Sequence, residues 1–400
     1  MRRSLLVVLL LVLALAAFPA LVDRALNRVV GPAPVPPSAR AAALFATLRV
    51  VDLHADPLLW QRDLGQRLGH GQVDVPRLIE GNVALQVFGL VTQSPLGQNF
   101  ERNESDAPDV ITLLAVLQRW PRATWSSRLA RAEHQAAKLD ALAAAFAGTL
   151  SVIRTAADLR DFGAARAQNP PRVAGLLGIE GAQALDGTLA GVDRLFAAGV
   201  RMIGLAHFFD NPVAGSSAGA AKHGLTPLGR EVVARMQALG IAVDLAHVSP
   251  ASVADALALA TKPVVVSHTG VQATCPGPRN LSDEQIRGVA ATGGVMGIAY
   301  FEGAVCGTEI AHIVRAMRHV KDLVGAEHLA LGSDFDGAVT TAFDTTALAA
   351  IVDGLIADGW SEAEIRGAMG ENALRVLGET LPAGRGESET RKSREALDPA

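Results

Sequence analysis

The chain has 400 residues, of which 50% are hydrophobic, 4% aromatic and 19% charged, and its formal net charge is -4 at pH 7. This length and apolar content are enough for one large barrel domain or two smaller domains, each with a buried core. Because the chain has no excess of basic residues and no stripe of Lys and Arg interleaved with aromatic residues, we expect no nucleic-acid partner.

The first 22 residues form a segment of their own. Arg2 and Arg3 precede residues 5–22, which carry no charge. This uncharged run lies on the border between a signal-peptide core and a short membrane span. Residues 1–22 are therefore expected to be a membrane anchor or, if cleaved, a signal peptide. In both cases the rest of the chain would lie outside the cytoplasm, in the periplasm or the extracellular space, either anchored or secreted.

Two more segments are predicted to lie outside the folded domain. Residues 23–40 contain the run GPAPVPPS, whose prolines favour a stiff, extended linker. Residues 381–400 have almost no apolar side chains, and we expect a disordered tail there. The folded domain is expected to span residues 41–380.

Eight continuous apolar runs of strand length alternate with helical patterns in this domain. The runs occupy residues 49–54, 83–91, 173–180, 201–207, 241–247, 263–268, 293–301 and 328–334. Helical patterns between them include residues 191–199, 226–240 and 249–260. A long insertion, residues 92–173, contains a helical segment near Ser127 to Ala147. The order predicts an α/β fold, a closed (β/α)8 barrel of the TIM type with an inserted helical segment, preceded by the N-terminal hydrophobic anchor.

Six of these runs end on side chains that can bind a metal or carry a proton. These side chains are His54 with Asp56, Glu180, His207, His247, His268 and Asp334. Catalytic groups of such barrels follow the carboxyl ends of the strands, so we expect these side chains to converge. His54 and Asp56 are two residues apart, and on an extended backbone they point to the same side.

The nitrogen and oxygen donors predict a metal site. Taken singly, a histidine after an apolar run is more often a core residue, and Glu180 could serve as a helix cap. Together, the five residues His54, Asp56, Glu180, His247 and His268 are too many for one tetrahedral zinc ion. They suit two zinc ions bridged by a carboxylate, and Glu180 is the natural bridge. The remaining histidines, at positions 70, 134, 223, 312, 319 and 328, receive no chemical role.

Asp334 and Asp336 lie in the segment LGSDFDG, which could be a simple turn. Asp334 follows the eighth run directly and is expected to face the mouth of the barrel. We predict that it acts as general base and then as general acid. Asp336 is expected to be a turn former. Cys275 and Cys306 could form one disulfide in an exported chain or remain two buried thiols.

Seven segments together resemble the membrane dipeptidase family, also called the renal dipeptidase-like peptidases. The resemblance covers residues 48–378 and rests on DLHAD, GIEG, AHFFDNP, GLTPLGREVVARMQALG with VDLAHVS, VVVSHTGVQATCPGPRN, LALGSDFDG and GENALRVL. It implies a binuclear zinc barrel that cleaves dipeptides, with tolerance for a D-residue on the carboxyl side. It also implies a bridge between Cys275 and Cys306, and a homodimer as one assembly state.

The resemblance implies a role for each residue. His54 and Asp56 would bind one zinc ion, His247 and His268 the other, and Glu180 both. His207 would contact the scissile carbonyl, Arg279 the substrate carboxylate, and Asp334 would carry the proton. The expected reaction is attack by a zinc-bridging hydroxide on a small peptide substrate.

Two other functions stay open from the sequence. One is an N-acyl amino acid amidase or another binuclear barrel hydrolase, although many such barrels use a carboxylated Lys as the bridge and no Lys ends a run here. The other is a catalytically dead, membrane-tethered binding module. The presence of every expected ligand and of Asp334 argues against the second.

Overall fold

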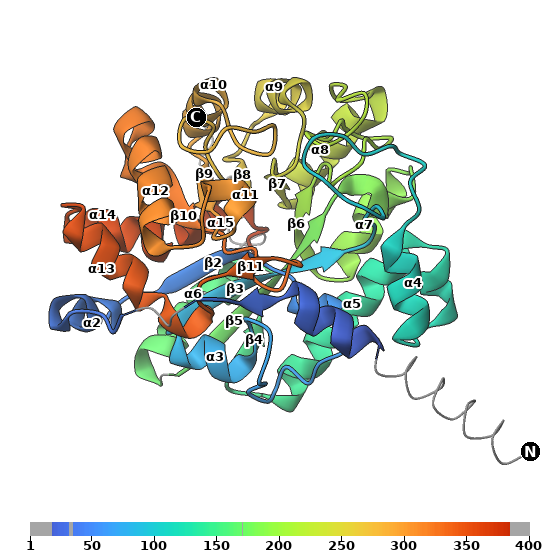
Figure 1. Cartoon of the computed structure of the whole chain (residues 1–400). Helices are drawn as coiled ribbons and strands as arrows, with labels where there is room; N and C mark the ends of the chain where they lie inside the picture. The colour runs from blue at the N-terminus through green and yellow to red at the C-terminus, as the bar shows by residue number, and fades with distance from the viewer. Residues whose placement is uncertain (1–17, 32–34, 170, 385–400) are drawn as a thin grey trace, which may run out of the picture.

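A closed barrel of parallel strands forms the centre of the molecule in a computed structural model that describes residues 18–31, 35–169 and 171–384 (Figure 1). Its strands are β2 (Val50–Ala55), β3 (Val83–Val91), β5 (Val173–Glu180), β6 (Val200–Gly204), β7 (Ala242–Asp244), β8 (Val265–Thr269), β9 (Val295–Ile298) and β10 (Leu329–Leu331). They pair in the order β3-β2-β10-β9-β8-β7-β6-β5, and pairing of β3 with β5 closes the barrel. The predicted barrel and all eight of its strands are confirmed.

Continuous burial explains why these runs form parallel strands. Every residue of β2, β3 and β5 is buried, because side chains fill one face of the barrel wall and helices cover the other. Alternating apolar and polar residues would have suited a sheet with one wet face, and the sequence does not show that pattern in these runs.

Helices surround the barrel in Figure 1. They include α7 (Ala190–Ala197), α8 (Pro227–Leu239), α9 (Pro250–Leu259), α10 (Asp283–Ala291), α12 (Ile310–Val324), α13 (Ala349–Ala357), α14 (Glu362–Arg366) and α15 (Asn372–Thr380). The three helical patterns predicted from the sequence are thereby confirmed as α7, α8 and α9. The start and end of α8 follow from its caps, since Thr226 accepts a hydrogen bond from the Gly229 amide and Gly240 ends the helix in the left-handed conformation.

The insertion after β3 contains α4 (Val110–Leu117), α5 (Arg128–Ala145), β4 (Leu150–Val152) and α6 (Ala156–Gln168). The helix predicted near residues 127–147 is confirmed as α5. The short β4 was not predicted; it pairs in parallel with the first residues of β5, with Leu150 opposite Val173. Helix α3 (Val75–Glu80) joins β2 to β3, and helix α11 (Glu302–Val305) follows β9.

The N-terminal segment packs against the barrel. Residues 18–26 are helical, and β1 (Arg28–Val29) pairs with β11 (Thr340–Thr341). Residues 23–31, expected to begin a linker, include the buried side chains of Asp23 and Asn27. Helix α2 (Ala39–Phe45) follows, capped by Ser38.

Parts of the predicted anchor and tail lie outside the described residues, namely residues 1–17 and 385–400. No helix within the described residues is long and apolar enough to span a membrane. A disulfide joins Cys275, in the loop after β8, to Cys306 at the end of α11, as the resemblance implied.

Candidate metal centre

The carboxyl ends of the barrel strands bring the predicted residues together around Glu180. The Oε1 atom of Glu180 lies 3.1 Å from Nε2 of His54, 3.3 Å from Nε2 of His268 and 3.5 Å from Nε2 of His247. Its Oε2 atom lies 3.0 Å from Nε2 of His207. One carboxylate thus has four imidazole nitrogens around it, and all five side chains are buried.

Two aspartates complete this cluster beside His54. Oδ1 of Asp56 lies 3.4 Å from Nε2 of His54, and Oδ1 of Asp334 lies 3.8 Å from the same nitrogen. The Nε2 atoms of His247 and His268 approach to 2.9 Å beside Oε1 of Glu180. The rings of His54 and His268 stack with their centroids 3.9 Å apart. Nitrogen and carboxylate donors therefore face one small volume.

The donor set suits a metal ion. Nε2 of His54 and Oδ1 of Asp56 are buried and have no hydrogen-bond partner among the described residues. Buried polar atoms without partners are costly, and coordination of a cation is one way to satisfy them. Three overlapping groups of possible ligand atoms each lie within 4.8 Å, namely His54 with His268 and Asp334, Glu180 with His207 and His247, and His54 with Asp56 and Glu180.

Hydrogen bonds at the far side of two imidazoles fix their protonation. Nδ1 of His207 lies 3.2 Å from the Gln93 carbonyl oxygen, which can only accept, so Nδ1 carries the proton. Nδ1 of His268 lies 2.9 Å from Oγ of Ser267, whose hydroxyl donates to Asp244 at 2.6 Å. For His268 this leaves the Nε2 lone pair free for a metal ion, as a metal ligand requires.

Burial and charge keep His247, His268 and Glu180 in their metal-binding forms. Burial lowers the pKa of His247 and His268 well below the usual value, and the positive charge of Arg279 acts in the same direction. Burial alone would raise the pKa of Glu180, but His207 and His54 outweigh it and hold that pKa well below its usual range. Neutral imidazoles and an ionised carboxylate are the forms that bind metal ions. Burial alone would lower the pKa of His54, but Asp56 and Glu180 outweigh it and raise that pKa well above its usual value, so a metal ion there would have to displace a proton.

Asp334 differs from the other acids of the cluster. Burial raises its pKa well above the usual value, and the charges of Glu180 and Asp56 raise it further. Its backbone has a φ of 61°, and that of His247 has a φ of 62°, a left-handed conformation that is uncommon outside glycine. Such residues cluster at functional sites, where the surrounding structure holds them in place.

Arg279 lies at the edge of the cluster in the loop after β8. It is buried, and its Nη2 donates to the His268 carbonyl oxygen at 2.8 Å and lies 3.3 Å from Nε2 of His247. Its Nε has no partner among the described residues. The disulfide from Cys275 ties down the same loop.

Supporting residues that the sequence analysis missed sit directly behind the ligands. Asp52 accepts hydrogen bonds from the amide and hydroxyl of Ser333, at 2.8 and 2.6 Å, and so joins β2 to the loop that carries Asp334. Asp244 does the same for Ser267 before His268. The sequence signal was present, since a serine immediately precedes a site residue in both places.

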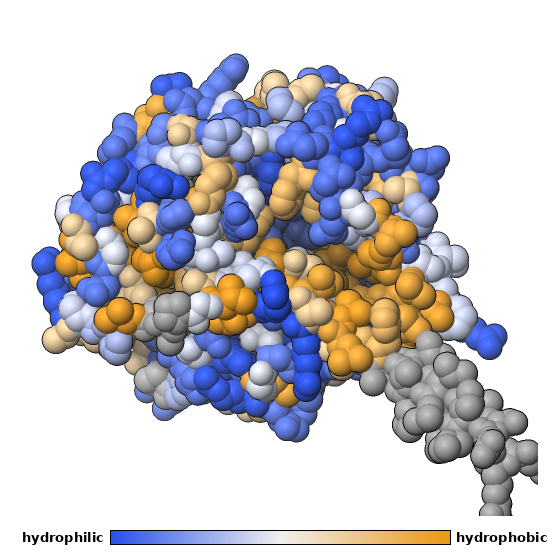
Figure 2. Space-filling view, viewed as in Figure 1, coloured by the Kyte–Doolittle hydropathy of each residue, from blue (hydrophilic) through white to orange (hydrophobic). Residues whose placement is uncertain are grey.

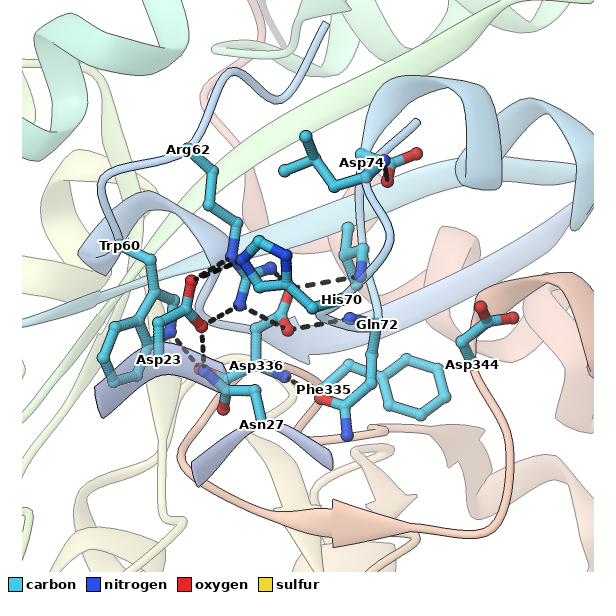
Figure 3. A network of polar contacts seen from close by, with 12 residues as sticks. Asp23, Asn27, Trp60, Arg62, His70, Gln72, Asp74, Phe335, Asp336 and Asp344 are labelled. Carbon is cyan, nitrogen blue, oxygen red and sulfur yellow. Dashed lines mark hydrogen bonds and ion pairs between the residues drawn. The ribbon is translucent and has the colours of Figure 1, made fainter. Parts of the chain in front are cut away.

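Asp336 was expected to form a turn, and its φ of 62° agrees, but it also takes part in a buried ion pair (Figure 3). Arg62 donates to Asp336 at 2.7 Å and to Asp23 of the N-terminal segment at 2.6 Å. His70, which received no role, lies 3.3 Å from Asp23. The network therefore connects three distant parts of the chain.

The sequence comparison with protein families decides the assignment. The model of the membrane dipeptidase family, Peptidase family M19, matches residues 38–390. The chain belongs to this family. The membrane dipeptidase match agrees with the resemblance in the sequence motifs and with the barrel and its cluster of metal-binding side chains.

The chain is also similar to individual proteins. A dipeptidase of Claviceps purpurea, tcpJ, is 29% identical over 323 residues, covering 77% of this chain and 69% of that protein. A Klebsiella pneumoniae protein encoded in the pqqA 5' region is 33% identical over 258 residues, covering 61% of this chain and 93% of that protein. A Rhodobacter sphaeroides metallopeptidase, solved with a phosphinate mimic of L-Ala-D-Ala, is 25% identical with a TM-score of 0.66, covering 84% of this chain and 99% of that one.

Proposed function

We propose that this M19 metallodipeptidase hydrolyses dipeptides with two zinc ions held by the cluster around Glu180. The observation that carries the proposal is the convergence of four imidazole nitrogens and a buried carboxylate at the ends of separate barrel strands. His54 and Asp56 would hold one ion, His247 and His268 the other, and Glu180 both. When bound, zinc ions polarise a carbonyl group and activate water as a nucleophile.

Asp334 is proposed to carry the proton. It lies beside His54, within 3.8 Å, and its raised pKa suits a group that accepts a proton and later donates it to the leaving amine. His207 is proposed to stabilise the developing negative charge on the carbonyl oxygen by donating a hydrogen bond from Nε2, a role in which both ring nitrogens carry a proton. Because the Gln93 carbonyl holds His207 Nδ1, the direction of its Nε2 atom is fixed.

Arg279 is proposed to bind the substrate carboxylate. A guanidinium group offers a planar fork that matches a carboxylate, and it keeps its charge at neutral pH. A carboxylate held next to the metal centre limits the residues that follow the scissile bond to one. The phosphinate mimic of L-Ala-D-Ala on the Rhodobacter sphaeroides relative supports tolerance for a D-residue at that position.

Replacement of Arg279 by Leu is expected to raise KM for dipeptides with little loss of zinc. Loss of a charged hydrogen-bonding partner costs about 2–5 kcal/mol in binding, which corresponds to a KM increase of 30-fold or more. Steady-state kinetics with L-Ala-D-Ala and with its carboxyl-terminal amide would check this. The amide should be hydrolysed equally by wild type and variant, and an unchanged KM for the free acid would remove Arg279 from the binding site.

A substrate panel tests the proposed reaction. It comprises L,L- and L,D-dipeptides, tripeptides and N-acyl amino acids, each assayed with zinc and with a chelator. Cleavage of dipeptides that stops with the chelator is expected. Cleavage of acylated substrates alone would favour the amidase function, and no turnover in the presence of bound zinc would favour the binding module.

We propose that residues 1–22 direct export of the protein, so that this activity lies outside the cytoplasm. The Cys275–Cys306 disulfide supports an oxidising compartment outside the cytoplasm, because disulfides are rare in cytosolic proteins. Amino-terminal sequencing of the protein isolated from membranes would distinguish a retained anchor from a cleaved signal peptide.

A further inference from the structure

The cavity above the metal centre extends well beyond it. It has a volume of about 940 Å³, near the upper end of the roughly 300–1,000 Å³ typical of pockets for drug-sized ligands. At its inner end lie Asp56, Glu180, His207, His247 and Asp334. A small dipeptide bound at that end leaves much of the cavity unfilled.

The outer end of this cavity is apolar. We call this part the outer wall and define it by Phe18, Val22, Leu26, Leu96, Leu113 and Leu117. Large apolar side chains in it are left open to solvent, with Phe18, Leu26 and Leu113 exposed at 45%, 42% and 55%. In Figure 2 hydrophobic residues gather beside the hollow on this face of the molecule. Exposed apolar surface of this kind marks a binding region.

The charges of the cavity argue for an uncharged occupant of the outer wall. Among the described residues that line the cavity, the charged ones are all acidic, namely Asp56, Glu180, Glu302 and Asp334. In the part of the chain that the structure describes, no Lys or Arg lines the cavity, so its lining offers no basic side chain to hold a phosphate or an anionic lipid headgroup. An apolar group is therefore the chemistry that fits.

The outer wall is held in place by the buried ion network of Figure 3. Asp23 lies between the wall residues Val22 and Leu26 in sequence, and it pairs with Arg62, which also pairs with Asp336. Asn27 bonds to Asp23 at 2.8 Å and accepts from the Ala338 amide at 2.8 Å. Separation of buried charged partners costs several kcal/mol, so the N-terminal helix is fixed at the cavity.

Barrel topology gives the direction of the substrate. Counting either way around the barrel, β8 lies four strands from β3. Arg279 follows β8, whereas Leu96 and Leu113 follow β3. With the substrate carboxylate on Arg279, the group on the amino side of the scissile bond points toward the outer wall.

We propose that the preferred substrates carry a long apolar group on the amino side of the scissile amide, bound by the outer wall. This proposal rests on the proposed function, because that function places the scissile bond at the metal centre. The apolar group can be the side chain of the first residue of a dipeptide or an N-acyl chain. The proposal requires that residues 18–22 are retained in the mature protein, and residues 18–30 then belong to the substrate-binding cavity.

Two substrate series test this with the full-length zinc-loaded protein. One is L-Xaa-D-Ala with Xaa as alanine, norleucine or 2-aminodecanoic acid, and the other is D-alanine acylated with chains of two, six or ten carbons. Each buried methylene is expected to raise kcat/KM about 3- to 4-fold in the series that the cavity accepts. The series in which kcat/KM rises with chain length shows whether the apolar group is the first side chain of a dipeptide or an N-acyl chain.

Matched variants locate the effect. In Leu26→Asn and in Leu113→Asn, kcat/KM should rise less with chain length. For the substrate with the ten-carbon group, kcat/KM should fall at least tenfold relative to the shortest member of the series. Leu21→Asn and Val116→Asn are the controls, because both residues are exposed on the same two helices but do not line the cavity. The controls should keep the wild-type dependence.

The outcomes separate this inference from the proposed function. Normal turnover of L-Ala-D-Ala with no dependence on chain length in either series would overturn the inference alone. Wall variants that keep this dependence but lose retention on phosphatidylcholine vesicles would also overturn it and assign the wall to membrane docking. If no substrate is cleaved, binding measured by calorimetry with the zinc-depleted protein still tests whether the outer wall binds an apolar group. Tighter binding of N-decanoyl- than N-acetyl-D-alanine, lost in Leu113→Asn but not in Val116→Asn, supports the wall, and equal binding contradicts it.

Discussion

Replacement of Asp334 by Asn should abolish turnover without removing zinc. The substitution keeps the shape of the side chain and takes away its ability to accept and return a proton. General acid–base catalysis contributes about 10²–10⁴-fold to a rate, and we expect a loss of kcat in that range. Kinetics with L-Ala-D-Ala and zinc analysis by atomic absorption on the same sample would measure both quantities.

Zinc content separates two roles for Asp334, because its carboxylate also lies near His54 and His268 in a possible ligand group. Loss of zinc from the Asn variant would make Asp334 a ligand, and retention of activity would remove it from the reaction. Asp106→Asn, at an exposed position in the inserted region, is the control for loss of one carboxylate and should leave both measurements unchanged.

Replacement of Gly89 by Ala should disrupt the candidate metal centre by displacing two of its proposed ligands. A Cβ atom at Gly89 in β3 would lie 2.0 Å from Oδ1 of Asp56 and 2.8 Å from Cε1 of His54. Both side chains would have to leave their present positions beside Glu180. Disturbing the support of a metal ligand typically costs about 10–100-fold in affinity, and displacement of two ligands should cost at least that much. Titration with a competing zinc chelator measures this loss for the weaker ion.

Gly178→Ala is the matched control for Gly89→Ala. Gly178 lies in the neighbouring strand β5, and a Cβ atom there would crowd Val87 Cγ1 at 2.9 Å, while its nearest neighbours include none of the metal-binding side chains. Overpacking costs about 1–3 kcal/mol of stability, so both variants should melt at lower temperature. A lower zinc affinity is expected for Gly89→Ala alone. Normal zinc affinity in that variant would show that His54 and Asp56 do not hold a metal ion.

The barrel and its site could be predicted because six of the eight barrel strands are marked twice in the sequence. Runs such as VAGLLGIE and PVVVSH combine continuous apolar residues with a polar residue at the carboxyl end. The continuous apolar run indicates a strand that is buried on both faces. The polar residue at its end indicates a side chain at the mouth of the barrel. Barrel closure then brings Glu180, His247 and His268 together, although they are far apart in the chain.

Other features depend on contacts that local patterns do not record. The short strands β1 and β11 form only beside each other, from opposite ends of the chain, and β4 forms only beside β5, beyond the intervening helix α6. Asp23 was assigned to the Pro-rich linker of residues 23–40, yet its side chain is buried and pairs with Arg62, 39 residues away. The left-handed backbone of His247 and Asp334 is likewise set by surrounding packing and not by glycine at those positions.

Stepwise return of zinc to the chelator-treated protein tests the central claim most directly, that hydrolysis depends on two ions held around Glu180. L-Ala-D-Ala hydrolysis would be followed against equivalents of zinc added to the full-length protein. We predict no turnover in the zinc-free protein and a plateau at two equivalents per chain. Full turnover in the chelator-treated protein, or a plateau at one equivalent, would contradict the account.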